Sequence, residues 1–158
     1  ICLGSYEVPI LAQAVQRLKY HGGQTLATPL GRALSDHLLP GFRPATIVPV
    51  PLHRSRQRER GFNQSQLLAE SLSVSSGLEC RAIVRRNRRT LSQVTLDEAD
   101  RQLNVRDAFT LVPGVEIIPK HAIIVDDVFT TGATISAVAR VLRTAGTTDI
   151  TAVTVAKG

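Results

Sequence analysis

Residues 122–134 read Ala-Ile-Ile-Val-Asp-Asp-Val-Phe-Thr-Thr-Gly-Ala-Thr, and this stretch decides the fold. Its apolar run, Ile123 to Val125, is short, uninterrupted and β-branched, which is typical of a strand buried on both faces of a parallel sheet. Two adjacent carboxylates are unfavourable to bury. We therefore expect Asp126 and Asp127 to emerge at the carboxyl edge of the sheet, where open α/β sheets bind ligands.

The segment after the acids predicts a loop that opens a helix. Apolar residues recur at helical spacing after this loop, and Gly146 is placed to end the helix. Because a helix N-terminus offers free amides and a positive dipole end, the loop suits a phosphate group. An ordinary strand–helix turn capped by Thr131 has the same layout, so the layout alone leaves both interpretations open. The loop residues that offer hydroxyls and backbone N–H groups are Thr130, Thr131, Gly132, Ala133 and Thr134.

The complete string, an apolar strand followed by two acids, an apolar pair and Thr-Thr-Gly-x-Thr, resembles the phosphoribosyl pyrophosphate (PRPP) motif of type I phosphoribosyltransferases. This resemblance implies an α/β fold with a mostly parallel central sheet flanked by helices. It also implies that Asp126 and Asp127 hydrogen-bond the ribose 2′ and 3′ hydroxyls, and that residues 130–134 cradle the 5′-phosphate. The lysine-containing P-loop is a different motif, since no Gly-Lys-Ser/Thr follows here.

Composition limits the chain to one ordinary domain, which we place over residues 1–158. With 43% hydrophobic and 20% charged residues, the chain reads as globular, and no apolar run is long enough to span a membrane. Cys2 and Cys80 are too few and too far apart for a disulfide framework, which favours a reduced, cytoplasmic setting. The chain has no methionine, even at position 1, so we expect an N-terminal segment to be missing.

Strands and helices are expected to alternate, which implies a parallel sheet with right-handed crossovers. Asn63, with Gln66 three residues later, resembles a capping box that opens a helix towards Gly77. Residues 81–96 are polar and basic and read as a loop or hairpin arm, and a capped helical turn is expected from Thr95. The other expected helices begin near Ile10 and Thr28, and the other expected strands cover 45–50, 105–112, 115–118 and 150–155.

A second group of candidate residues follows the strand expected at 45–50. Four arginines stand at every second position: Arg54, Arg56, Arg58 and Arg60. An extended segment would place all four on one side, whereas a helix would spread them around its axis. Arginine offers a planar, permanently charged fork suited to phosphate oxygens, although a solvated basic face is the alternative interpretation. The formal net charge of the chain is +6.

Further motifs resemble the ComF/GntX family of competence-related, phosphoribosyltransferase-like proteins over most of the chain. The motifs are Leu-Lys-Tyr-His-Gly at 18–22, Val-Pro-Val-Pro-Leu-His at 48–53, Arg-Gly-Phe-Asn-Gln at 60–64, Arg-Thr-x-x-Gln at 89–93 and Arg-x-x-Asn at 101–104. The resemblance implies that a mobile arm at 85–93 closes over the site. It also implies a pyrophosphate-binding loop made of Val50, Pro51, Leu52, His53 and Arg54.

The implied activity is Mg²⁺-dependent transfer of ribose 5-phosphate from PRPP to an acceptor that the sequence does not identify. Mg²⁺ would be held mainly through the ligand, with no direct protein ligand. Arg56, Arg60 and Arg89 are the candidate catalytic residues, because cations at the departing pyrophosphate stabilise the transition state. No general base stands out, and His53 is more often a structural residue in such a position. Members of this family commonly carry an N-terminal zinc-binding module, but Cys2 alone gives no basis for predicting zinc here.

Two alternatives use the same fold without turnover. One is a regulator that binds PRPP or a nucleotide, and the other is a competence-related protein that binds single-stranded DNA. The basic stretch favours DNA binding, whereas the scarcity of aromatic residues, 4% of the chain, argues against a base-stacking platform. A protein of the competence machinery is a further expected partner, and a homodimer is left open.

Overall fold

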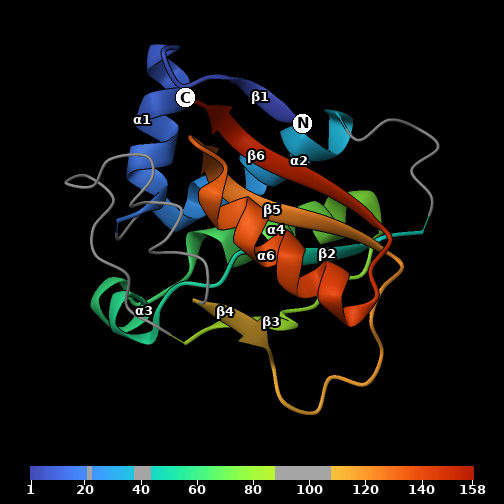
Figure 1. Cartoon of the computed structure of the whole chain (residues 1–158). Coiled ribbons are helices and arrows are strands. Elements are labelled where there is room, and N and C mark those ends of the chain that lie inside the picture. Colours follow the sequence, from blue (N-terminus) through green and yellow to red (C-terminus); the bar gives the residue numbers. More distant parts are fainter. Residues whose placement is uncertain (21–22, 38–43, 88–107) are drawn as a thin grey trace.

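The computed structural model describes residues 1–20, 23–37, 44–87 and 108–158. Its centre is a parallel sheet in the order β1-β6-β5-β2 (Figure 1). The strands of this sheet are β1 (Cys2–Ser5), β2 (Thr46–Pro49), β5 (His121–Phe129) and β6 (Asp149–Lys157). The predicted α/β class and mostly parallel sheet are therefore confirmed.

Strand β5 forms where the β-branched run predicts it, in the middle of the sheet between β2 and β6. Its alternating side chains enter two separate cores, because successive residues of a strand point to opposite faces. Ile123 and Val125 belong to the core on one face, and Ile124 belongs to the core on the other face. All three are at most 1% exposed, which explains why the run is apolar throughout instead of alternating with polar residues.

Three helices cover the first face of the sheet: α1 (Pro9–Leu18), α2 (Ala27–His37) and α4 (Gln64–Ser76). A 3₁₀ turn, η1 (Gly23–Leu26), joins the first two. Leu18, Leu34 and Leu68 bring these helices into one core with the sheet residues Ile123 and Val125. Helices α2 and α4 also pack closely on each other, since a Cβ on Gly31 would lie 2.4 Å from Ser71 Oγ.

The second face is covered by α6 (Ala133–Ala145) and by a separate two-stranded sheet. In Figure 1 helix α6 lies in front of the central sheet and α4 lies behind it. The small antiparallel sheet consists of β3 (Val84–Arg86) and β4 (Phe109–Leu111). Val138 and Leu142 of α6 pack with Phe109 and Ile124 in this second core. Within the segment read as a loop or hairpin arm, residues 84–86 form β3, whereas residues 88–96 and the turn expected from Thr95 lie outside the described residues.

The arginine-rich segment is helical, which decides between the two interpretations of its sequence. Helix α3 (Arg54–Arg60) begins where the His53 side chain accepts a hydrogen bond from Ser55 N at 3.2 Å. It ends at Gly61, whose φ of 84° is left-handed. The four arginines therefore point in different directions around the helix axis.

Three expectations need correction. Residues 115–118 do not form a strand, and the Ile117 carbonyl accepts a hydrogen bond from Arg81 Nη1 at 3.1 Å. Strand β1 was not predicted from the sequence. The capping box is half formed, because Asn63 Oδ1 caps α4 through Ser65 N, whereas Gln66 bonds Glu70 instead.

The described part of the chain also bears on membrane spanning and on the state of Cys80. Within it, no helix is both long and apolar enough to cross a membrane. Cys80 is partly buried against the first core, and this burial raises the pKa of its thiol to about 11. The raised pKa keeps the Cys80 thiol protonated near neutral pH, which makes it a poor nucleophile.

Candidate functional site

The acid pair lies in β5 just past the carboxyl end of its neighbour β2. The last residue of β2, Pro49, is in register with Val125, and the chain of β2 then turns away. On the other side β6 continues, with Thr154 in register with Asp126. Asp126 and Asp127 are 8% and 6% exposed, so the expectation that they emerge from the sheet is wrong. They stay in the strand because neighbouring elements supply hydrogen bonds and a counter-charge.

Asp126 is held by α4 and by the strand itself. Ser65 Oγ donates a hydrogen bond to Asp126 Oδ1 at 2.8 Å, and Asp127 N donates to the same oxygen at 2.9 Å. Burial, together with the negative charge of Asp127, raises the pKa of Asp126 to about 7. The hydrogen bonds and the charge of Lys19 oppose this increase without cancelling it. Near neutral pH the pair therefore sits at the boundary between one and two negative charges.

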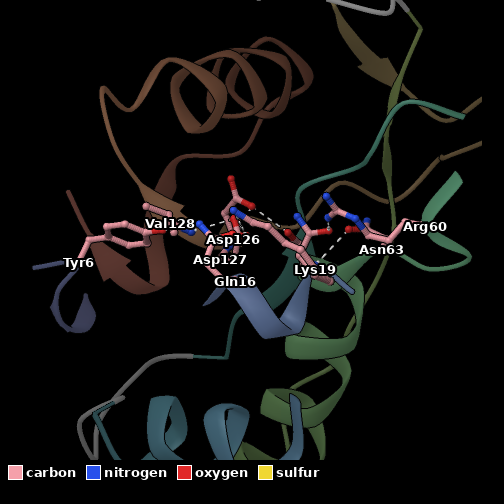
Figure 2. A network of polar contacts seen from close by, with 10 residues as sticks. Tyr6, Gln16, Lys19, Arg60, Asn63, Asp126, Asp127 and Val128 are labelled. Carbon is pink, nitrogen blue, oxygen red and sulfur yellow. Dashed lines mark hydrogen bonds and ion pairs between the residues drawn. The ribbon is translucent and has the colours of Figure 1, made fainter. Parts of the chain in front are cut away.

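Asp127 faces α1 on the first side of the sheet. Lys19 Nζ, at the C-terminal end of α1, lies 3.1 Å from Asp127 Oδ2, and Val128 N donates to Oδ1 at 2.9 Å. The ion pair lacks hydrogen-bond geometry, so buried Oδ2 keeps an unused acceptor site. Figure 2 shows Lys19 reaching towards the acids, with Arg60 and Asn63 beyond it. Asp127 therefore offers a buried carboxylate whose charge is balanced by Lys19.

The predicted phosphate loop follows β5 and forms the start of α6. Gly132 is the N-cap of α6, and Ala133 N donates to Thr131 Oγ1 at a long 3.4 Å. Thr130 is exposed, and Thr131 and Thr134 are half-buried. A 13-residue helix such as α6 presents free amides and a positive dipole end here, which gives the loop the chemistry of a phosphate site.

Gly132 is required at its position for two reasons. Its φ is 75°, which strains any residue with a side chain, and a Cβ there would lie 2.6 Å from Phe129 Cζ. We expect Gly132→Ala to lower the free energy of unfolding by about 1–3 kcal/mol and to displace the loop. Urea unfolding of both proteins measures the change.

Gly77→Ala is the matched control, because Gly77 has nearly the same φ, 73°, but open space around its Cβ position. Gly77→Ala should lose only the part of the unfolding free energy that comes from forcing alanine into a left-handed backbone conformation. If the two variants lost equal stability, the contact between Gly132 and Phe129 would not constrain the loop.

The predicted pyrophosphate loop leaves the end of β2 next to the acids. Val50 N donates to Val125 O at 2.9 Å, and Asn63 Nδ2 donates to Val50 O at 3.0 Å. These bonds fix the loop against β5 and α4. His53 uses Nδ1 to cap α3, as described above, which supports a structural role over that of a general base.

A cavity of about 560 Å³ lies on one side of this loop. Three arginines line it, Arg54 of α3 with Arg85 and Arg86 of β3, and none of the described lining residues is acidic. Asp126 and Asp127 do not line this cavity. Burial lowers the pKa of Arg86, and the negative charge of Asp126 opposes this effect. Arg86 therefore links this cavity electrostatically to the acid pair. The remaining lining residues are Pro49, Pro51, Leu52, His53, Gln57, Asn63, Gln66, Ala82, Val84, Asn87 and Val112.

A smaller pocket of about 230 Å³ lies on the other side of α3. Its lining residues are Lys19, Tyr20, Arg56, Glu59 and Arg60. Burial lowers the pKa of Arg60, and the negative charge of Asp127 partly opposes this effect. The pocket therefore lies close enough to the acids for their charge to act on it. Helix α3 thus directs Arg54 to the large cavity and Arg56 and Arg60 to the small pocket. Arg58 lines neither.

The structure thus brings most of the predicted residues to one edge of the sheet, while Arg89 lies outside the described residues. Sequence reasoning did not assign a role to Lys19 or Ser65, and it included Arg86 only as part of the arm at 85–93. Lys19 and Arg86 do lie in segments that the sequence marks as unusual, the Leu-Lys-Tyr-His-Gly motif and the basic arm. Ser65 gave no signal of its own, since it follows the capping Asn63 as an ordinary helix residue.

Solved structures define the class of fold. An allosteric regulatory enzyme of purine biosynthesis aligns with a TM-score of 0.56 and 16% identity, over 89% of this chain and 30% of that one. Glutamine PRPP amidotransferase from B. subtilis, complexed with ADP and GMP, aligns with a TM-score of 0.56 and 19% identity, over 87% of this chain and 30% of that one. The chain therefore has the type I phosphoribosyltransferase fold.

Curated relatives then define the family. Competence protein F of Haemophilus influenzae is 35% identical over 160 residues, which cover 95% of this chain and 69% of that protein. DNA utilization protein YhgH of Escherichia coli K12 is 37% identical over 143 residues, covering 85% and 61%. Competence protein ComFC of Streptococcus pneumoniae is 33% identical over 135 residues, covering 85% and 57%. The chain belongs to the competence protein F family.

The chain spans between 57% and 69% of the length of these relatives. No protein-family model matches it.

Proposed function

We propose that this chain binds PRPP, or a closely related phosphosugar, at the edge of the sheet where Asp126 and Asp127 lie. The observation that carries the proposal is the buried acid pair itself. Two adjacent carboxylates are kept in a strand at 8% and 6% exposure, with Lys19 as the cation paired with Asp127. An arrangement that is unfavourable for folding is most simply explained by a ligand that uses it.

The three parts of PRPP match three neighbouring features. The 5′-phosphate would bind the loop at 130–134, where the N-terminus of α6 provides amides. The ribose hydroxyls would donate to Asp126 and Asp127. The pyrophosphate would bind the loop from Val50 to Arg54, which borders the cavity lined by Arg54, Arg85 and Arg86.

Mg²⁺ is the cofactor that we propose for this ligand. The described residues contain no cluster of three or more His, Cys, Asp or Glu side chains that could hold a metal ion by themselves. The donors that suit Mg²⁺ would therefore come mainly from the pyrophosphate and ribose oxygens of the ligand, in keeping with its preference for oxygen ligands and retained waters. When bound, Mg²⁺ would neutralise the pyrophosphate charge.

We further propose that the site transfers ribose 5-phosphate to an acceptor. A nucleophilic atom of the acceptor would bond to the anomeric carbon while the bond to pyrophosphate breaks, and pyrophosphate would leave with the electron pair. Arg56 is a candidate for stabilising the departing charge, because it lines the small pocket next to Arg60 and its positive charge also acts on Arg86 of the large cavity. Arg60 and Arg89 remain candidate catalytic residues, and Arg86 joins them.

Transfer is tested by incubating the protein with PRPP, Mg²⁺ and a panel of bases and amines, and measuring the pyrophosphate released. We expect release with at least one acceptor and none in the variant Asp126→Asn/Asp127→Asn. If PRPP bound but no acceptor released pyrophosphate, the catalytic half of the proposal would fail and a PRPP-binding regulator would replace it.

DNA binding is a second candidate function. Relatives of this chain are called DNA utilization and competence proteins, and three arginines of α3, Arg54, Arg56 and Arg58, are exposed. Binding to single-stranded DNA through these residues should weaken steeply as salt rises, with a slope of about −0.7 per phosphate contacted. Affinity for an oligonucleotide measured at several salt concentrations checks this, and weak binding without such a slope would exclude it.

A further inference from the structure

The pocket beside α3 that faces Lys19 is the most distinctive feature that the PRPP proposal leaves unused. Its volume of about 230 Å³ is below the roughly 300–1,000 Å³ typical of sites for drug-sized ligands, so it suits a single small ring. It adjoins the ribose-binding acids, since Lys19 pairs with Asp127 at 3.1 Å. It also lies on the opposite side of α3 from the cavity that we give to pyrophosphate.

The charges that line this pocket favour an anion. Among the described lining residues, Arg56 and Arg60 contribute two cations against the carboxylate of Glu59, and the charge of Lys19 is balanced by Asp127. Arg60 Nη1 is oriented by a hydrogen bond to Gln64 Oε1, and Gln64 is itself buried at 6% exposure. A guanidinium fixed in this way can bind a carboxylate with two parallel hydrogen bonds.

The pocket also carries an exposed aromatic side chain. Tyr20 is 67% exposed, so most of its ring is open to solvent. It follows Lys19 directly, at the end of α1, and lines the pocket together with Arg60. An exposed ring beside a cationic pocket provides a stacking surface for a planar ligand.

We propose that this pocket is the acceptor subsite, and that the acceptor is a small aromatic ring that carries a negative charge, such as a ring carboxylate. The ring stacks on Tyr20, and its anionic group binds Arg60. The inference rests on the proposed function, because only PRPP bound at the acids gives the pocket an acceptor to hold. It places Arg60 on the acceptor side of the ribose, with Arg56 in the same pocket.

The test uses ring acids and their uncharged amides as matched probes, nicotinate with nicotinamide and benzoate with benzamide. Affinity is measured by ligand-observed NMR in the presence of PRPP and Mg²⁺. The acids should bind at least about 10-fold more tightly than the amides. Tyr20→Ala should weaken binding of the acids about 10-fold, as expected for one lost stacking contact, and Arg60→Gln should abolish the preference for the acids.

Arg58→Gln is the control variant, because Arg58 is on the same helix but lines neither pocket. It should bind acids and amides as the unsubstituted protein does. Each variant is also titrated with PRPP alone, and Tyr20→Ala should keep its PRPP affinity. If PRPP bound normally but acids and amides bound alike, or Tyr20→Ala had no effect, the acceptor subsite would be wrong and the PRPP site would stand.

Two further outcomes distinguish a failure of the acceptor subsite from a failure of the proposed PRPP site. If PRPP did not bind but acids still bound through Tyr20 and Arg60, the PRPP proposal would fail and the pocket would be an anion site of another kind. If Tyr20→Ala abolished binding of a single-stranded oligonucleotide while the ring acids showed no preference, the pocket would belong to a nucleic-acid interface, and the inference would be overturned.

Discussion

Replacing Asp126 and Asp127 together by asparagine is expected to weaken PRPP binding by about 100-fold or more while the protein stays folded. Each carboxylate that accepts a ribose hydroxyl contributes about 1.5–3 kcal/mol as a charge-assisted hydrogen bond, and two such losses correspond to at least two orders of magnitude. Asparagine keeps the size of the side chain and can still accept from Ser65 Oγ, which bonds Asp126 at 2.8 Å. Calorimetric titration with PRPP and Mg²⁺ measures the affinity.

The matched control is Asp36→Asn/Asp149→Asn, which makes the same change in net charge at two exposed positions. It should bind PRPP like the unsubstituted protein, and thermal unfolding should show that both double variants are folded. If the variant at 126 and 127 kept its affinity, the acids would not contact the ligand and the site assignment would be lost.

Asp126→Asn alone is expected to stabilise the protein, and to do so more strongly at pH 8 than at pH 5. In the folded protein the pKa of Asp126 is raised from 3.8 to about 7, so the folded state binds more protons than the unfolded state between these values. Stability from this group is therefore fully present only below about pH 3.8, and it is lost as pH rises from there through 7. Asparagine carries no proton to lose and removes this dependence.

The expected gain at pH 8 is at least about 1 kcal/mol, since each pKa unit corresponds to about 1.4 kcal/mol. In a domain of this size, that gain raises Tm by about 2–4 °C. Unfolding of both proteins at pH 5 and pH 8 measures it, with Asp149→Asn as a control that should show no such gain. An equal difference between the two proteins at both pH values would mean that Asp126 is ionised throughout this range.

Together these two expected results describe a site that is maintained at the expense of stability. A carboxylate that destabilises the folded protein at physiological pH, yet binds the ligand, is the trade-off expected where function needs a strained or charged group. The position of Lys19 fits this view. Its charge limits the repulsion between the two acids until a ligand supplies hydroxyl donors.

Much of the fold could be predicted because the decisive signals are local. The β-branched run at 123–125 and the periodic helix that ends at Gly146 depend only on neighbouring residues, and both formed as expected. Strand β1 could not be predicted, because a four-residue strand at the sheet edge is defined by pairing with β6 at the far end of the chain. The strand expected at 115–118 was wrong because it was inferred from a local apolar pattern alone. Among the described residues no strand pairs with this segment.

The site was predicted in its parts but not in its connections. The acids, the threonine loop and the arginine run each have a recognisable sequence, so their roles could be proposed without a structure. Sequence could not show whether the arginine run is extended or helical, because alternate spacing is compatible with both. Two capping residues decide it, His53 and Gly61, and the resulting helix divides the arginines between two pockets. Lys19 became visible only through its contact with Asp127.

The most direct test of the account is a calorimetric titration of the unsubstituted protein with PRPP in the presence of Mg²⁺, repeated with ribose 5-phosphate or pyrophosphate already present. The account predicts saturable binding at one site per chain, weakened by each of the two fragments, because they occupy opposite ends of the same site. Absence of PRPP binding would contradict the account, and so would binding that neither fragment weakens.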